Sequence, residues 1–261
     1  GEQLMLGAPA WPVAKAQALD GRGDAAKKAK ARDAGWAVQA AALGNCLNQL
    51  VPNLQALCAG TGQAEHVHQA RVAMRRLRVA LRELAALAPE GSANWANHNA
   101  ALQAAFAQLG QVRDVQVSAD QPDLQRALAA HGLTQAKGKA RAQIALAEAA
   151  MAAARGTALQ HSLVALLVQL AQPHAVGKAL SAKATRQHLA ARLQRQHRSL
   201  AKAAAQWSTL STDERHTLRK RAKRQRYLVE FALPLMAEHA GAARAASRYL
   251  GRLAQLPEAL G

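Results

Sequence analysis

Apolar residues recur every three or four positions along most of the chain, which is the spacing of side chains on one face of an α-helix. This pattern predicts helices over about 36–51, 63–88, 95–117 and 123–172, with further helices from about residue 183 onward. Proline and glycine mark the expected interruptions. Pro52 ends the first helix, the second stops at Pro89-Glu90-Gly91, and Gly156 breaks the fourth region.

The composition favours helices over strands. β-Branched and aromatic residues are sparse, with aromatics at 3%, whereas Ala and Leu dominate. We therefore predict an all-α fold, in which the regions before about residue 175 supply one antiparallel bundle of the four-helix type. In the third of these helices the apolar side is formed by Trp95, Leu102, Phe106 and Leu109.

A stripe of cations follows the predicted helix 63–88. Its members have the spacing that stacks side chains on one face, namely His68, Arg71, Arg75, Arg78 and Arg82. An apolar stripe runs beside it, formed by Val67, Ala70, Met74, Leu77, Leu81 and Leu84. A solvated face normally mixes signs, yet Glu83 is the only acid in this interior. Like charges about 5–6 Å apart repel by roughly 1–3 kcal/mol before screening, which favours neutralisation of the stripe by a bound polyanion.

The cationic pattern returns in the second half of the chain. At an offset of 148 residues, His216, Arg219, Lys223 and Arg226 repeat the spacing of the first stripe, and Arg224 matches Arg76. Ser211 and Glu214 form a capping-box signature before this helix. The preceding amphipathic helix, from about 183, adds Arg192, Arg195, Arg198 and Lys202. Both halves are therefore predicted to build the same kind of site.

The repeat stops before it is complete. The segment 248–261 resembles the one that leads to Leu109-Gly110, so the second half lacks a counterpart of 123–172. We predict a flexible linker over 1–35, one helical bundle over 36–175, and a second, incomplete bundle over 176–261. The alternative is that its missing helices are truncated, disordered or supplied by a partner molecule.

The charge balance restricts the partner. Lys and Arg number 34 against 16 Asp and Glu, which gives a net charge of +18. Nucleic acid, an anionic membrane surface and an inorganic polyanion all fit this charge. Cys46 and Cys58 have no CxxC or zinc spacing, so free thiols in a reducing cytoplasm are expected, with a single disulfide as the less favoured alternative.

Two segments bear on targeting. The first 35 residues lack the apolar stretch of a signal peptide, and their start at Gly suggests part of a longer protein. The uncharged stretch 156–177 contains Gln, His, Ser and Pro, so we interpret it as a buried helix rather than a membrane span.

Three segments carry a resemblance to a known family. VHQARVAMRRLRVAL, LGQVRDVQV and RHTLRKRAKRQRYLVEF, in this order, resemble signature segments of the CHAD family, the "conserved histidine α-helical domain". The likeness covers about 36–261. It implies two four-helix bundles related by a pseudo-twofold, and binding of inorganic polyphosphate at polyphosphate granules in the cytoplasm. The Pro-rich start is similar to the linker after an upstream CYTH triphosphatase domain.

The resemblance also implies which residues bind. In the two halves these are His68, Arg71, Arg75, Arg76, Arg78 and Arg113, then His216, Arg219, Lys223, Arg224 and Arg226. The neighbouring cations complete our predicted polyphosphate site: Arg82, Arg195, Arg198 and Lys220. The histidines add donors whose charge depends on pH. The chain departs from the family pattern at Gln225, where an apolar Leu is expected, and in lacking the second LGxx[RN]D motif.

The predicted function is non-catalytic binding of polyphosphate in a groove or pore lined by the two repeated basic helices. A phosphohydrolase, or an accessory domain of one, is the first alternative, but no P-loop, HExxH or ExE pattern supplies metal ligands or a nucleophile. Asp114, beside Arg113, is better explained as an ion-pair partner or cap than as a catalytic group. Nonspecific nucleic-acid binding is the second alternative, disfavoured by the scarcity of aromatics for base stacking. No cofactor or metal is expected.

Overall fold

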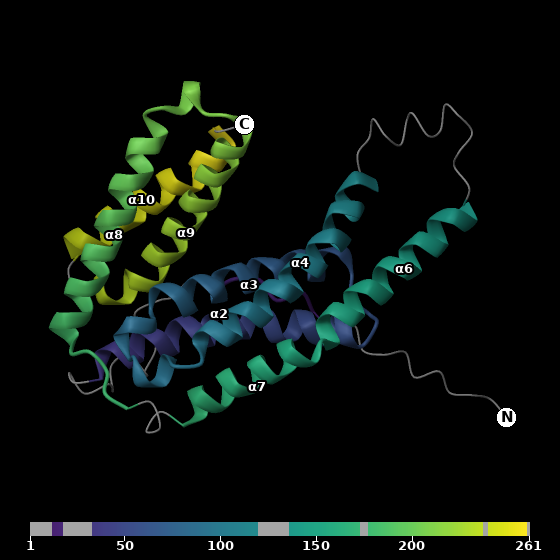
Figure 1. The fold of residues 1–261 in the computed structure, drawn as a ribbon, viewed down its shortest axis with the longest axis horizontal. Helices are drawn as coiled ribbons and strands as arrows, with labels where there is room; N and C mark the ends of the chain where they lie inside the picture. The colour runs from purple at the N-terminus through teal and green to yellow at the C-terminus, as the bar shows by residue number, and fades with distance from the viewer. Residues whose placement is uncertain (1–11, 18–32, 120–135, 173–176, 237–239, 260–261) are drawn as a thin grey trace. The chain divides into compact units, whose positions relative to one another are not determined.

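Figure 1 presents a computed structural model of the chain, which describes residues 12–17, 33–119, 136–172, 177–236 and 240–259. Every regular element in these ranges is an α-helix or a short 3-10 turn, and they contain no strand. The all-α prediction is therefore confirmed. Most of the predicted linker 1–35, and residues 123–135 of the fourth predicted region, lie outside the described residues.

The chain divides into two compact units, and α2, α3, α4 and α7 contribute residues to both of them. Unit 1 comprises Gly1–Gln17, Cys46–Arg78 and Asn97–Leu167. Unit 2 comprises Ala18–Asn45, Val79–Ala96 and Val168–Gly261. The boundary expected near residue 175 and the internal repeat stay predictions.

Unit 1 is built around α3. Its helices, whole or in part, are α2 (Ala34–Cys58), α3 (Ala64–Glu83), α4 (Trp95–Ala119), α6 (Ala136–Arg155) and α7 (Thr157–Ala171). The predicted apolar stripe is buried at all six positions, five of them on α3 and Leu84 directly after it, and each side chain is at most 2% exposed. A hydrogen bond joins α2 to α3, in which Gln49 Nε2 donates to Gln69 Oε1 at 2.9 Å. Cys46 and Cys58 are both free thiols.

The prediction that Pro52 ends the first helix is wrong. α2 continues through it to Cys58, with Pro52 inside the helix. A proline in a helix interior costs about 3 kcal/mol, but Leu50, Leu54 and Leu57 on either side of it are at most 3% exposed. Burying a leucine contributes about 1.5–3 kcal/mol. Packing therefore outweighs the local preference.

The second helix ends earlier than its pattern predicts. α3 stops at Glu83, and two 3-10 turns follow, η1 (Ala85–Leu87) and η2 (Glu90–Ser92). The fully buried amide of Gln39 makes this end possible, because its Nε2 donates to the carbonyl of Leu84 at 2.7 Å and to Ser92 Oγ at 3.2 Å. A helix end leaves carbonyls without partners, and here a distant side chain satisfies one.

The break at Gly156 is confirmed, since α6 ends at Arg155 and α7 begins at Thr157. The uncharged stretch beyond it forms α7, in which Leu159, Leu163 and Leu166 are buried. Among the helices that the structure describes, none combines the length and the hydropathy needed to cross a bilayer.

Unit 2 contains α8 (Ala182–Ala204), α9 (Thr212–Met236) and α10 (Ala240–Ala259), and α9 packs against both of the others. The capping box is confirmed: the Ser211 backbone N–H donates to Glu214 Oε2 at 2.8 Å, and the Glu214 N–H donates to Ser211 Oγ at 3.3 Å. Leu200, Leu218, Ala222 and Leu253 form a small core near the α8–α9 connection.

Candidate anion-binding site

Three arginines of α3 gather around one aromatic ring of α4 in unit 1. The Cζ atoms of Arg71, Arg75 and Arg78 lie 4.2, 5.4 and 5.8 Å from the ring centroid of Phe106. A cation over a ring face is attracted by about 0.5–1 kcal/mol at an exposed site and more when desolvated. We call these four residues the Phe106 cluster. The sequence predicts Phe106 on the apolar side of its helix, whereas in the structure the ring is half-buried and contacts the three arginines.

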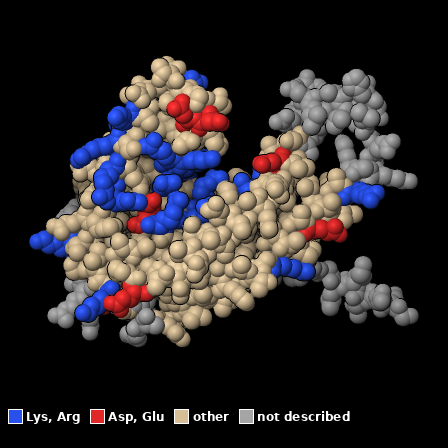
Figure 2. Space-filling model, in the orientation of Figure 1, with Lys and Arg blue, Asp and Glu red and all other residues tan. Residues whose placement is uncertain are grey.

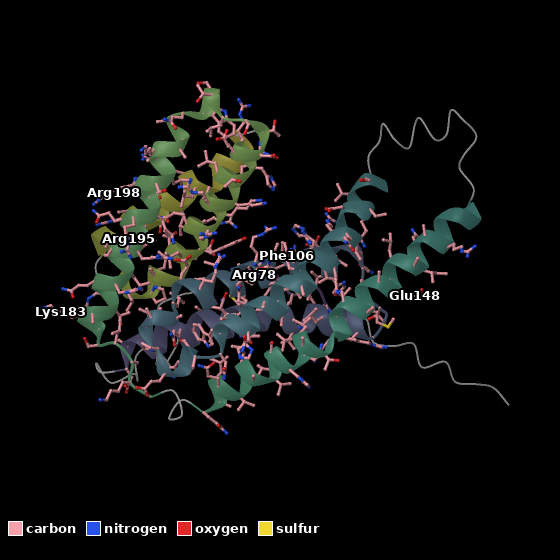
Figure 3. All side chains as sticks on the ribbon, in the orientation of Figure 1. Arg78, Phe106, Glu148, Lys183, Arg195 and Arg198 are labelled. Atoms are coloured by element: carbon pink, nitrogen blue, oxygen red, sulfur yellow. The ribbon has the colours of Figure 1, made fainter. Side chains whose placement is uncertain are left out.

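Side chains and backbone of α4 hold two of the three guanidinium groups, those of Arg71 and Arg78, by hydrogen bonds. Arg71 Nη1 donates to the carbonyl of Phe106 at 2.7 Å. Arg78 Nε donates to Asn99 Oδ1 at 3.2 Å, and its Nη2 donates to Gln103 Oε1 at 2.9 Å. Figure 3 shows Arg78 beside Phe106. All of these acceptors are neutral, so the arginines are positioned without losing their charge.

The glycine of the LGQVRD segment has a steric role. A Cβ atom at Gly110 would clash with Arg71 Nη1, so any larger residue there would displace the guanidinium. Gly110 is buried on α4, one turn after Phe106. The motif therefore combines a close approach for Arg71 with the ring that the cluster surrounds.

Charge in the cluster is left largely uncompensated. Among the described residues, no carboxylate forms an ion pair with Arg71 or Arg75. Burial lowers the pKa of Arg71, with Arg75 and Arg113 lowering it further and Asp114 opposing them. A guanidinium stays protonated in proteins. Arg71 and Arg75 thus keep their charges without a carboxylate partner among the described residues, which is the arrangement that a bound phosphate would complete.

His68 begins the same face and responds to the same charges. Burial lowers the pKa of His68 below 6.5, and Arg113, Arg75 and Arg71 lower it further, while Glu65 acts in the opposite direction. The neutral form of His68 is therefore favoured in the free protein. A bound polyanion would offset the arginines and raise this pKa, so binding would take up a proton.

We expect the affinity for a polyanion to rise as pH falls from 8 to 5.5. The affinity rises over the pH range between the pKa of His68 in the complex and its lower pKa in the free protein. Below the pKa of the free protein, the affinity no longer changes with pH through His68. A one-unit shift corresponds to about tenfold. Titration calorimetry at constant ionic strength measures it, with His68→Gln as the comparison. Equal affinity at the two pH values, or an unchanged profile in the variant, would contradict this role.

Two predicted cations of α3 lie apart from the Phe106 cluster. Arg76 is only 3% exposed, and its Nη1 donates to Gln49 Oε1 of α2 at 3.1 Å, so its environment is the core of unit 1. Arg82 belongs to unit 2. There, burial lowers the pKa of Arg82, as do the charges of Arg224 and Arg192, while Glu83 raises it.

A second concentration of cations lies in unit 2 between α8 and α9, and Figure 2 shows Lys and Arg gathered over these helices with few acids among them. A hollow of about 250 Å³ is lined by Arg192, Arg195, Gln196, Ser199, Arg221 and Arg224. Each of these side chains carries an N–H or O–H donor. Arg221 Nη2 donates to Ser199 Oγ. We call this the α8–α9 hollow.

One buried acid sits beside the α8–α9 hollow. Glu83 at the end of α3 is 3% exposed, and its Oε2 accepts from Arg192 Nε at 2.6 Å and from Gln196 Nε2 at 2.7 Å. These charge-assisted bonds are stronger than neutral ones. Glu83 therefore anchors one wall of the hollow.

The structure distributes the predicted residues of unit 2 unevenly. Arg195 and Arg224 line the hollow, whereas Arg198, His216 and Lys220 are exposed outside its lining. Of the predicted cations that are half-buried on α9, Arg226 lies with its Nε 3.4 Å from Glu230 Oε1. The other predicted ones outside the lining are Arg219 and Lys223.

Of the six residues that line the hollow, only Arg195 and Arg224 belong to the site predicted from the sequence, although the sequence holds a signal for the others. Arg192, Arg195, Gln196 and Ser199 are spaced i, i+3, i+4, i+7, which is one helix face, and Arg221 with Arg224 shows the i, i+3 spacing. Ranking positions by that face would have selected Arg192 and Arg221. Within the ranges that the structure describes, no three His, Cys, Asp or Glu side chains gather in a way that could hold a metal ion.

Comparisons with known proteins agree on one family. The family model of the CHAD domain matches residues 41–261. The crystal structure of the CHAD domain from the plant Ricinus communis is similar, with a TM-score of 0.64 and 26% sequence identity. That alignment covers 92% of this chain and 78% of the plant chain. No curated protein matches the sequence.

Proposed function

Because this chain belongs to the CHAD domain family, we propose that it binds inorganic polyphosphate through the Phe106 cluster and the α8–α9 hollow. CHAD domains are generally associated with polyphosphate. The observation that carries the proposal for this chain is the gathering of three guanidinium groups around Phe106, of which Arg71 and Arg75 have no carboxylate partner among the described residues.

The chemistry of the ligand matches these donors. Polyphosphate offers closely spaced anionic oxygens and no bases, so it needs cationic donors and no stacking platform. Arg presents a planar fork of N–H groups that suits phosphate oxygens. The one aromatic ring in the Phe106 cluster is already surrounded by guanidinium groups, which leaves it poorly suited to stack on a base.

The proposal retains two finer expectations from the sequence. One is that the repeated basic helices line a common groove or pore for a single chain of phosphates. The other is that this binding directs the protein to polyphosphate granules in the cytoplasm. If one polyphosphate molecule contacts both the Phe106 cluster and the α8–α9 hollow, removing the cations of either should weaken the binding of long-chain polyphosphate strongly and the binding of tripolyphosphate much less.

We expect long-chain polyphosphate to outcompete duplex DNA at equal charge concentration in 150 mM salt. If polyphosphate behaves like a single-stranded nucleic acid, the logarithm of the binding constant should fall linearly with the logarithm of the salt concentration, with a slope of about −0.7 per phosphate contact. Fluorescence anisotropy of a labelled polyphosphate, with unlabelled DNA as competitor, measures both quantities. If DNA displaces polyphosphate at comparable concentration, nonspecific electrostatics explain the binding instead.

We also propose that the domain does not hydrolyse its ligand. The carboxylate nearest to the Phe106 cluster along α4 is Asp114, which is exposed and acts electrostatically on Arg71. Hydrolysis of a phosphoanhydride ordinarily needs metal-holding carboxylates or an activated nucleophile. Incubation with polyphosphate and Mg²⁺ should therefore release no orthophosphate, and release above a protein-free control would favour the hydrolase alternative.

A further inference from the structure

The α8–α9 hollow differs in shape from the Phe106 cluster. Donors converge on the hollow from two helices: α8 contributes Arg192, Arg195, Gln196 and Ser199, and α9 contributes Arg221 and Arg224. The Phe106 cluster instead places its three arginines along α3 alone, over about 10 Å at 1.5 Å per residue. The hollow can therefore surround an anion from two sides, whereas the cluster offers cations from one helix.

The volume of the hollow restricts its ligand. At about 250 Å³ it is smaller than the pockets of about 300–1,000 Å³ that hold drug-sized molecules. A nucleoside does not match such a space, and neither does a long run of phosphates. A compact anion, such as a single phosphate group, does.

The positive charge of the hollow exceeds what its neighbours compensate. Four of the six lining side chains are guanidinium groups, and no carboxylate lines the hollow. Arg192 is paired through its Nε with Glu83. Among the described residues, no carboxylate forms an ion pair with the other three arginines. Because like charges repel one another, a ligand that carries more than one negative charge on a single group is favoured.

Hydrogen bonds hold both walls of the hollow in place. Glu83, which is 3% exposed, accepts from Arg192 and Gln196 on α8. Arg221 of α9 donates to Ser199 of α8. Donors that are already positioned lose less conformational entropy on binding than free side chains do. The hollow therefore suits a ligand of fixed and compact geometry.

A linear polyphosphate contains two kinds of phosphate group. Each inner group is bridged on both sides and keeps two free oxygens with one negative charge. Each terminal group keeps three free oxygens and can lose a second proton, which in phosphate monoesters has a pKa of about 6. At neutral pH the end of the chain is therefore the most highly charged and most compact acceptor that the polymer offers.

We propose that the α8–α9 hollow binds the terminal phosphate group of polyphosphate, and that the Phe106 cluster binds inner groups of the chain. The guanidinium groups of α8 and α9 contact the three free oxygens of the end from both sides, and an inner group offers only two. This inference rests on the proposed function, because it assigns the two anion sites to different parts of the same polymer.

The probe is long-chain polyphosphate of one length, either with free ends or with both ends closed as methyl phosphoramidates. Closing an end replaces one of its oxygens by a nitrogen and leaves it with the single charge of an inner group. We expect the parent chain to bind the free-ended polymer at least tenfold more tightly than the closed-ended polymer. Titration calorimetry in about 0.15 M salt measures the two affinities without a label on the chain ends.

Two double variants locate the recognition of the end. Arg195→Gln/Arg224→Gln removes one guanidinium group from each wall, and neither arginine takes part in the hydrogen bonds that hold the walls. This variant should keep the helical circular dichroism and bind both polymers alike within twofold. The matched control Arg244→Gln/Arg248→Gln removes the same charge from exposed positions of α10 and should keep the tenfold difference.

The proposal is overturned if the parent chain binds both polymers equally, because the ends then make no contribution. It is also overturned if the difference persists in Arg195→Gln/Arg224→Gln, because the ends are then recognised elsewhere. Displacement of free-ended polyphosphate by ATP, at an equal concentration of terminal phosphates, would overturn the assignment to polyphosphate. If the parent chain binds neither polymer, the proposed function itself fails, and that result is distinct from equal binding of both.

Discussion

Arg75→Glu/Arg78→Glu is expected to abolish polyphosphate binding and to leave the helical circular dichroism largely unchanged. Both side chains belong to the Phe106 cluster and lie on the half-buried face of α3. A hydrogen bond to a charged group contributes about 1.5–3 kcal/mol, so two lost contacts amount to about 10²–10⁴-fold in affinity, before the repulsion added by two carboxylates.

The matched control is Arg244→Glu/Arg248→Glu on α10. Each arginine-to-glutamate substitution lowers the net charge by two, so both double variants have a net charge of +14 instead of +18. Arg244 and Arg248 are exposed and outside both anion sites. We expect the control to lose less than about threefold, as a long-range electrostatic effect in physiological salt. Equal losses in the two variants would mean that net charge, and not the Phe106 cluster, governs binding.

A second double substitution distinguishes the loss of charge from misfolding. Arg78 donates to Asn99 and Gln103, and a glutamate there would face two amide oxygens. Arg75→Gln/Arg78→Gln removes both charges without adding carboxylates and keeps an N–H donor at position 78, although on a shorter side chain. It should fold like the parent chain and still lose most of the affinity. If instead it binds normally, the guanidinium groups are structural and hold α3 against α4.

Periodicity was sufficient to predict how α3 is oriented. The i, i+3, i+4 spacing separates the buried stripe of Val67, Met74 and Leu77 from the cations on the neighbouring face, and the structure has both. Gly156 likewise broke the helical pattern where expected. These features follow from local geometry and from apolar burial, which are encoded within one helix.

Features that depend on another helix were not predictable in the same way. Arg76 can be buried because Gln49 of α2 accepts a hydrogen bond from it. α3 can end at Glu83 because Gln39, 45 residues before Leu84 in the sequence, donates a hydrogen bond to the carbonyl of Leu84. Pro52 stays inside α2 because leucines on both sides of it are buried. Phe106 occupies an apolar position of its helix pattern, so the sequence alone predicts a core residue. Its contact with the arginines becomes visible once α3 and α4 are packed together. In each case tertiary contacts override a local preference.

Glu83→Gln is expected to destabilise the fold and at the same time to tighten polyphosphate binding. Glu83 is the buried acceptor for Arg192 and Gln196, and Arg82 and Arg224 lie near enough to affect one another electrostatically. The neutral amide keeps the size of the side chain but loses a charge-assisted bond, so we expect a loss of about 2 kcal/mol. For a chain of this length, that lowers Tm by about 4–8 °C.

Affinity should change in the opposite direction to stability. Without the carboxylate, the α8–α9 hollow gains one net positive charge, and Arg192, whose side chain is 39% exposed, becomes available to phosphate oxygens. We expect binding to become about three- to tenfold tighter, and saturating polyphosphate to raise Tm more in the variant than in the parent chain, because the ligand replaces the missing anion. Differential scanning fluorimetry with and without polyphosphate measures both effects. Weaker binding in Glu83→Gln would show that Glu83 positions Arg192 for the ligand, and an unchanged Tm would show that the pair does not stabilise unit 2.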